Sequence, residues 1–115
     1  MSLIKISRDG HTDRAVVPRP VSVDASSLER SRDYLFADDA RGCYLGFSGS
    51  IAGPSEFPSF PADELAIVIS GEMKISDRLG NLTVLREGDA ALIPRGSVFD
   101  WQSPVDVSKL FGSQN

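Results

Sequence analysis

From Gly42 onward the chain alternates short apolar runs with clusters of Gly, Pro, Asn and Asp. Short runs bounded by such turn residues are typical of antiparallel β-strands, and no run has the length and period of an amphipathic helix. The pattern predicts strands at residues 43–47, 65–70, 72–76, 82–85, 90–93, 98–102 and 105–111. Many short strands without helices indicate an all-β fold, either an antiparallel sandwich or a barrel.

Residues 1–40 differ in composition, with prolines, several serines and alternating charges. Ser26 and Glu29 have the spacing of a capping box, so one short helix is expected to begin at Ser26. We predict an N-terminal arm over residues 1–40 and one β-domain over residues 41–115. The arm is expected either to be loosely held or to add an edge strand to a partner's sheet through its valines.

A chain of 115 residues, 41% of them hydrophobic, is long enough for one domain with a small core. Its formal net charge is −4 and its basic residues are scattered, so neither nucleic acid nor an anionic membrane is expected as a partner. Apolar stretches of signal-peptide or membrane-span length are absent, and we expect a cytoplasmic protein. The lone Cys43 forms no internal disulfide and is interpreted as a small apolar strand residue.

Two motifs at a fixed spacing carry the most specific information. Glu64 precedes an apolar run that ends at Gly71, and after sixteen further residues the segment 88–96 reads Gly-Asp-Ala-Ala-Leu-Ile-Pro-Arg-Gly. The glycines and the proline suit tight turns between strands. Together with Trp101, this spacing resembles the small single-domain cupins grouped with (S)-ureidoglycine aminohydrolase and the ethanolamine-utilisation cupin proteins. The resemblance implies a cupin-type double-stranded β-helix, a jelly-roll barrel, with an N-terminal arm.

The resemblance also implies where a divalent metal would be held. Cupins usually supply two His and a Glu from the first motif and one His after the second, and the Glu corresponds to Glu64. The histidine positions are occupied here by Phe57 and Ser59 or Pro58 and Phe60, and by Phe99. The single histidine of the chain, His11, lies outside both motifs.

We therefore expect a degenerate metal site and no cofactor, with a divalent metal left open. An oxygen-only set of Glu64 with Glu56, Asp63 or Asp100 would suit Mg²⁺ or Ca²⁺ better than a transition metal. The string Asp9-x-His11-x-Asp13 is interpreted as a solvated segment.

The alternation of side chains along a strand predicts which residues share a face with Glu64. If Glu64 points into the barrel, Ala66 and Val68 point inward as well, whereas Leu65 and its alternate neighbours face outward. Both faces of this strand are apolar. A second subunit is the usual cover for such an outer face, so we predict a homodimer.

The interior would then hold one carboxylate among aromatic rings. The predicted ligand-binding residues are Glu64, Phe99, Trp101, Ser59, Tyr44 and Lys109. A carboxylate beside an indole ring suits a small cation. In the competing interpretation Phe99 and Trp101 only fill the barrel, and Glu64 pairs with an arginine such as Arg41 or Arg95.

Two functional classes remain open. The first is a cupin that binds a small amine or amino-acid-like metabolite without transition-metal catalysis. The second is a metabolite-converting enzyme of the ureidoglycine aminohydrolase type, with Glu64 as general acid or base, or as a metal ligand. A pure interaction module is a third possibility.

Overall fold

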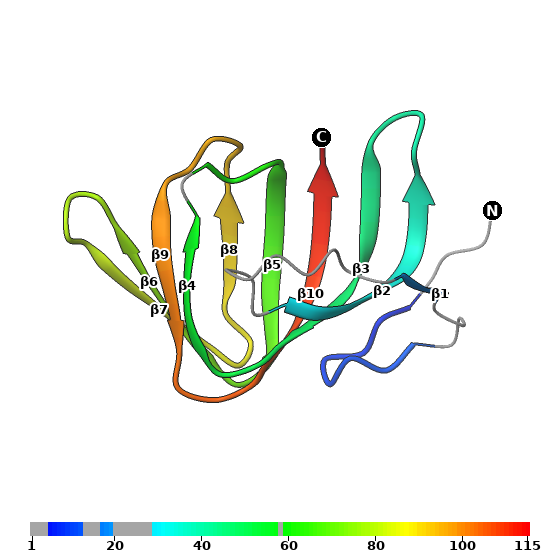
Figure 1. The fold of residues 1–115 in the computed structure, drawn as a ribbon. Helices are drawn as coiled ribbons and strands as arrows, with labels where there is room; N and C mark the ends of the chain where they lie inside the picture. The colour runs from blue at the N-terminus through cyan, green and yellow to red at the C-terminus, as the bar shows by residue number, and fades with distance from the viewer. Residues whose placement is uncertain (1–4, 13–16, 20–28, 58) are drawn as a thin grey trace.

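The computed structural model describes residues 5–12, 17–19, 29–57 and 59–115, and these residues form strands and turns without a helix (Figure 1). Ten strands in this part of the chain pair into two antiparallel sheets. They are β1 (Val17–Arg19), β2 (Glu29–Asp38), β3 (Cys43–Ser50), β4 (Gly53–Phe57), β5 (Asp63–Ser70), β6 (Glu72–Asp77), β7 (Leu82–Arg86), β8 (Ala90–Ile93), β9 (Phe99–Ser103) and β10 (Val107–Gln114).

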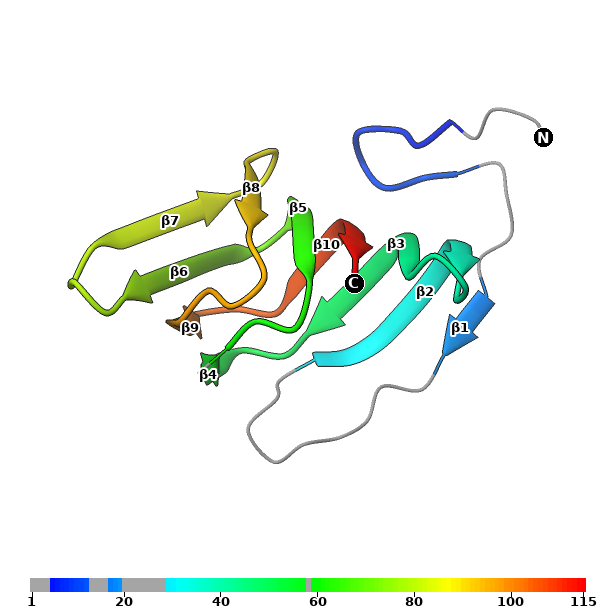
Figure 2. The ribbon, with the colours of Figure 1, turned by 90° about the horizontal axis from the view of Figure 1, so that it is seen from above.

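The larger sheet has the strand order β1-β2-β3-β10-β5-β8, and the smaller sheet has the order β4-β9-β6-β7. From β3 onward the chain crosses between the sheets at every connection except the β6–β7 hairpin. This connectivity is that of a jelly roll, so the predicted all-β cupin-type fold is confirmed. Seen from above, the larger sheet continues through β2 and β1 beyond the smaller sheet (Figure 2).

All the predicted strands are present, with bounds that differ by at most a few residues. β2 and β4 were not predicted, and a strand at β1 was expected only as an edge strand of a partner's sheet. The helix expected from Ser26 is wrong from Glu29 onward, because Glu29 begins β2; Ser26 itself lies outside the described residues. β2 pairs with β3 along most of its length and buries Leu35. These tertiary interactions outweigh the local capping signal.

Part of the predicted arm therefore belongs to this chain's own sheet. β2 lies between β1 and β3, and β1 pairs with β2 through Val17–Arg19. The other valines on which the edge-strand prediction rested, Val16, Val21 and Val23, lie outside the described residues. The region from 29 to 38 thus forms an extension of the β-domain.

The core lies between the two sheets and follows the predicted parity. On β5, Glu64, Ala66 and Val68 are buried, whereas Leu65 is 48% exposed. The main apolar cluster draws on both sheets and their connections and consists of Phe60, Val68, Met73, Leu85, Ile93, Phe99, Trp101 and Val107. Because Glu64 shares a face with the core residues of β5, its carboxylate is directed into the molecule.

Gly71 joins β5 to β6 with a φ of 92°, in the region that favours glycine. A Cβ at this position would overlap the carbonyl oxygen of Asp106. The predicted turn role of Gly71 is confirmed, and the close approach of the β9–β10 connection gives a second reason for glycine.

Candidate functional site

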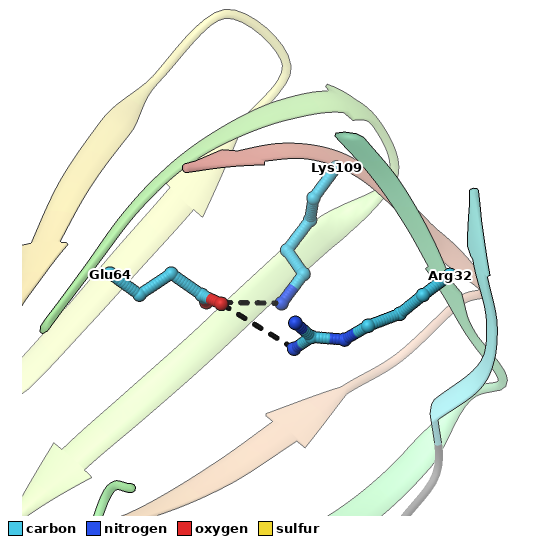
Figure 3. A network of polar contacts seen from close by, with 3 residues as sticks. All are labelled: Arg32, Glu64 and Lys109. Atoms are coloured by element: carbon cyan, nitrogen blue, oxygen red, sulfur yellow. Dashed lines mark hydrogen bonds and ion pairs between the residues drawn. The ribbon is translucent and has the colours of Figure 1, made fainter. Parts of the chain in front are cut away.

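Glu64 is the second residue of β5, and only 2% of it is exposed. Two cationic side chains reach its carboxylate (Figure 3). Arg32 Nη2 donates to Oε1 at 3.4 Å, and Lys109 Nζ lies 4.0 Å from Oε2. Both distances are at the long end for their type of contact. The site is therefore an ionic triad, defined here as Arg32, Glu64 and Lys109.

The register of the larger sheet brings the two cations together. Arg32 on β2 and Lys109 on β10 are both cross-strand partners of Ser48 on the intervening β3. Their side chains share the inner face, and two positive charges this close require a counter-charge. Glu64 supplies this counter-charge from β5, which pairs with β10 on the side away from β3.

Aromatic rings hold the cations in place. The Arg32 guanidinium carbon lies 4.3 Å from the centroid of the Phe111 ring, and Lys109 Nζ lies 4.6 Å from the centroid of the Trp101 ring. Trp101 donates its indole N–H to Ser103 Oγ, which fixes the ring. These cation–π contacts offset part of the cost of burying the two charges in a mostly apolar interior.

A cavity of about 330 Å³ opens beside the triad. Its walls are aromatic and polar, and its lining residues are Arg32, Tyr34, Tyr44, Phe60, Pro61, Ala62, Glu64, Ser113 and Asn115. The rings of Tyr34 and Tyr44 meet edge to face with centroids 5.7 Å apart. Tyr44 donates its hydroxyl hydrogen to Asp39 Oδ1 at 2.8 Å, so this wall is held by the exposed β2–β3 turn.

Two buried oxygens add to the polar character of the site. Among the residues that the structure describes, Glu64 Oε2 and Ser48 Oγ find no hydrogen-bond donor or acceptor. Leaving a buried polar atom unsatisfied costs free energy. Of these two residues, Glu64 lines the cavity and Ser48 does not.

The sequence-predicted site residues divide into four groups. Glu64 and Tyr44 line the cavity. Lys109 and Trp101 do not line it: the Lys109 ammonium group lies over the Trp101 ring and next to the Glu64 carboxylate. Phe99 is in the core, where its ring packs against Phe60 at a centroid distance of 5.6 Å. Ser59 is exposed and is not among the residues that line the cavity.

Glu64 does pair with an arginine, as the competing interpretation expected, but with neither of the two examples, Arg41 and Arg95. The side chain of Arg41 is 83% exposed and lies 3.8 Å from Asp38, and Arg95 is an exposed loop residue whose backbone N–H donates to Asp63. The partner is Arg32, in the segment that the sequence analysis assigned to the arm. Finding it from sequence would have required recognising β2 as a strand of the same sheet.

The donor set around Glu64 does not fit a divalent metal. Two cations already surround the carboxylate, and they oppose a third positive charge. At the histidine positions of other cupins, Phe60 and Phe99 are buried apolar residues, while Pro58 and the side chain of Phe57 lie outside the described residues. The residues described here contain no cluster of three or more His, Cys, Asp or Glu side chains suited to a metal.

The alternative oxygen ligands are not gathered around Glu64 either. Glu56, Asp63 and Asp100 are all exposed, whereas Glu64 is buried. His11 Nδ1 lies 2.9 Å from Asp9 within an exposed turn; Asp13 lies outside the described residues.

In a comparison with known families, residues 51–111 match the EutQ-like cupin domain. No curated protein matches the chain. The predicted resemblance to ethanolamine-utilisation cupins is thereby confirmed, whereas the relation to ureidoglycine aminohydrolase stays a prediction.

Several solved structures share the fold. An ethanolamine utilization protein Q from Salmonella typhimurium LT2 is 22% identical with a TM-score of 0.61, and the alignment covers 73% of this chain and 68% of that one. The Clostridium difficile EutQ protein is 19% identical with a TM-score of 0.64, covering 79% and 65%. A cupin 2 conserved barrel domain protein from Rhodopseudomonas palustris is 19% identical with a TM-score of 0.65, covering 98% and 80%. Identities this low establish the fold alone.

In the part of the chain that is described, no helix is long and apolar enough to cross a bilayer.

Proposed function

We propose a binding function for this chain, which belongs to the EutQ-like cupin family: it takes up a small amine or amino-acid-like metabolite in the cavity beside Glu64, without transition-metal catalysis. The observation that carries the proposal is a carboxylate that is 2% exposed and lines an open cavity of about 330 Å³. Carboxylates are rarely buried in a small protein core, so a buried carboxylate on a cavity wall marks a candidate functional site. The proposal places the protein in the cytoplasm, where the lone Cys43 stays reduced.

The composition of the cavity supports a small polar ligand with an apolar part. Tyr34, Tyr44 and Phe60 provide ring faces, and Arg32 and Glu64 provide charges of opposite sign. Pockets that combine apolar walls with a few convergent polar groups are the usual form of small-molecule sites. Relatives named for ethanolamine utilization make amino compounds the first class to test.

The test is a binding screen of small amines and amino acids by thermal shift, followed by isothermal titration calorimetry. Glu64→Gln is expected to abolish binding, whereas Glu56→Gln, the same change at an exposed position, is expected to leave it unchanged. Ser113→Leu provides a second variant that fills the cavity without removing a charge. If both cavity variants fold and still bind the hit as tightly as the parent chain, the ligand lies elsewhere and the proposal is wrong.

The enzyme of the ureidoglycine aminohydrolase type remains the second candidate. Its support is the position of Glu64 on the wall of the cavity, where a carboxylate could act as a general acid or base toward a bound metabolite. Each ligand found in the screen is therefore incubated with the protein and followed by NMR. Conversion that Glu64→Gln removes would favour the enzyme, and an unchanged ligand spectrum would favour the binding protein.

A further inference from the structure

The inner face of the larger sheet separates an acidic end of the cavity from an aromatic end. Glu64 on β5 is the cross-strand partner of Ser113 on β10, and Ser113 is in turn the partner of Tyr44 on β3. Directly opposed residues point to the same face of a sheet, and all three line the cavity. Adjacent strands lie about 5 Å apart, so the backbones of Glu64 and Tyr44 are separated by roughly 10 Å. Ser113 lies between them, and its short side chain leaves space above the sheet.

The tyrosines at the aromatic end are held in place by their neighbours. The ring of Tyr34 meets that of Tyr44 edge to face with centroids 5.7 Å apart, and it meets the ring of Phe111 in the same way at 5.8 Å. Phe111 is fully buried, and Tyr44 donates its hydroxyl hydrogen to Asp39. Gly46, the strand neighbour between Phe111 and Tyr34, has no side chain to keep these two rings apart. Both tyrosine rings are therefore positioned before a ligand arrives, which lowers the entropic cost of binding.

A third ring comes from the connection between β4 and β5. Phe60 lines the same cavity, and its backbone N–H donates to the carbonyl oxygen of Ser97 at 2.9 Å. Its own carbonyl oxygen accepts the N–H of Gly96 at 2.8 Å. Three of the nine lining residues are thus aromatic, so ring surface is the main apolar material of the walls.

The cavity is larger than the smallest amines require. Its volume of about 330 Å³ lies at the lower end of the range for pockets that enclose drug-sized ligands, ~300–1,000 Å³. Methylamine or ethylamine at Glu64 would not extend to the tyrosines, and the aromatic walls would stay in contact with water. A phenyl group on a short chain extends along the row from Glu64 and replaces that water by ring–ring contact, which adds to the gain from burying its apolar area.

We propose that the ligand carries an aromatic ring on a short chain, as in an arylalkyl amine or an aromatic amino acid. Its amino group lies toward Glu64 and its ring lies against Tyr34 and Tyr44. This inference rests on the proposed binding function and narrows its ligand class. The two tyrosines lie on β2 and β3, outside the residues 51–111 that match the cupin family, so these two strands supply the selectivity for the ring.

The experiment uses amines that differ only in what the short chain carries. The probes are ethylamine, 2-cyclohexylethylamine and 2-phenylethylamine, and L-alanine with L-phenylalanine forms a second matched pair. Saturation-transfer NMR detects binding to the full chain, and calorimetry gives the dissociation constants. The phenyl compound of each set is expected to bind at least about tenfold more tightly than the compound without a ring, and 2-cyclohexylethylamine is expected to fall between the two amines.

Two variants at one position separate the ring of Tyr44 from its hydroxyl group. Tyr44→Leu is expected to weaken binding of 2-phenylethylamine by about tenfold and to leave binding of ethylamine nearly unchanged. Tyr44→Phe keeps the ring and loses the hydrogen bond to Asp39, so it is the matched control and should bind nearly like the parent chain. Tyr44 is half-buried near the start of β3, so both variants are expected to fold, and thermal unfolding checks this.

A measurement on the parent chain does not depend on any variant. The chain contains two tyrosines, and both line the cavity. Nuclear Overhauser effects between the phenyl protons of the bound probe and tyrosine ring protons are therefore expected. Their absence for a probe that binds would overturn the placement of the ring.

The outcomes separate the two proposals. If ethylamine and 2-phenylethylamine bind equally well and both depend on Glu64, the binding function stands and the ring inference is overturned. If 2-cyclohexylethylamine binds as tightly as 2-phenylethylamine, the cavity selects apolar volume and the ring inference is wrong. If none of these probes binds at millimolar concentration but the broader screen finds another amine that depends on Glu64, only the ring inference fails; if that screen is empty as well, both proposals fail.

Discussion

At the residue scale, the burial of Lys109 and Glu64 makes their charges interdependent. The two side chains are 5% and 3% exposed, and each lies in the core side of the larger sheet. Removing one partner of a buried ion pair leaves the other charge without compensation in a medium of low dielectric constant. Removing one member of this pair should therefore destabilise the protein more than the loss of that side chain alone would, because the other charge stays buried without a partner.

Glu64→Gln is expected to lower the free energy of unfolding by about 3–5 kcal/mol, because Lys109 loses its counter-charge. Lys109→Met should cost less, since Arg32 still compensates Glu64 and the Met side chain still covers Trp101. The double variant should be more stable than Glu64→Gln alone. Urea unfolding of the four proteins gives the coupling free energy; strictly additive losses would show that the pair is not coupled.

At the element scale, two glycines with nearly the same φ should respond differently to substitution. Gly71 and Gly88 have φ values of 92° and 87°. A Cβ at Gly71 would overlap the Asp106 carbonyl oxygen, whereas a Cβ at Gly88 would meet nothing within 4 Å. Gly88→Ala should therefore cost only the backbone term of about 1–2 kcal/mol. Gly71→Ala should cost on the order of 3 kcal/mol or more.

Thermal and urea unfolding of these two alanine variants checks the expected difference. Equal losses would mean that the β9–β10 connection moves away from Gly71 at little cost, contrary to the contact described above.

The β6–β7 hairpin provides a prediction about pH. The side chain and backbone N–H of Asn81 donate to the Asp77 carboxylate, together with the backbone N–H of Leu79, and hold the pKa of Asp77 below its ordinary value of 3.8. Because the folded pKa is lowered, the stabilisation is complete above the unfolded pKa and disappears as the pH falls through the folded pKa.

Asp77→Asn retains an acceptor oxygen but does not titrate, so its stability should fall less than that of the parent chain between about pH 5 and about pH 3. Unfolding midpoints at the two pH values check this. Parallel pH dependence in the two proteins would contradict the role assigned to the turn.

Strand assignment from sequence succeeded where alternation and turn residues agreed. β8 was predicted with its observed bounds, because a short apolar segment lies between Gly88–Asp89 and Pro94. β2 was missed, since its sequence Glu-Arg-Ser-Arg-Asp-Tyr-Leu-Phe-Ala-Asp is rich in charges. One of those charged residues, Arg32, faces inward and forms an ion pair with Glu64. A local sequence pattern does not reveal this pairing, because the two residues lie on different strands.

At the scale of the whole molecule, the outer face of the larger sheet is apolar over five strands. Phe36, Leu45, Gly112, Leu65 and Leu92 form one row of consecutive cross-strand neighbours from β2 to β8. Leu65 and Leu92 are 48% and 70% exposed. The turn at Gly10 lies against another part of this face. A Cβ added to Gly10 would be only 3.2 Å from Ile69 Cδ1.

The predicted homodimer would bury this row. Leu92→Lys should therefore shift the chain toward the monomer in analytical ultracentrifugation, because a charge in an apolar interface is costly. Leu79→Lys, at an 87% exposed leucine in the β6–β7 turn, is the control and should leave the oligomeric state unchanged. A parent chain that is monomeric at all concentrations would refute the prediction.

The sequence by itself determined the all-β class, the common face of Glu64, Ala66 and Val68, and the turns at Gly71 and Gly88, because each depends on local alternation or on backbone conformation. The jelly-roll topology was implied by the resemblance to the cupins. Only the tertiary structure decided what Glu64 meets. Arg32 and Lys109 are distant from it along the chain, and the sheet order β2-β3-β10-β5 brings them to its carboxylate. Charge pairing across a sheet depends on strand order and register, and neither is encoded in the spacing of residues along a single strand.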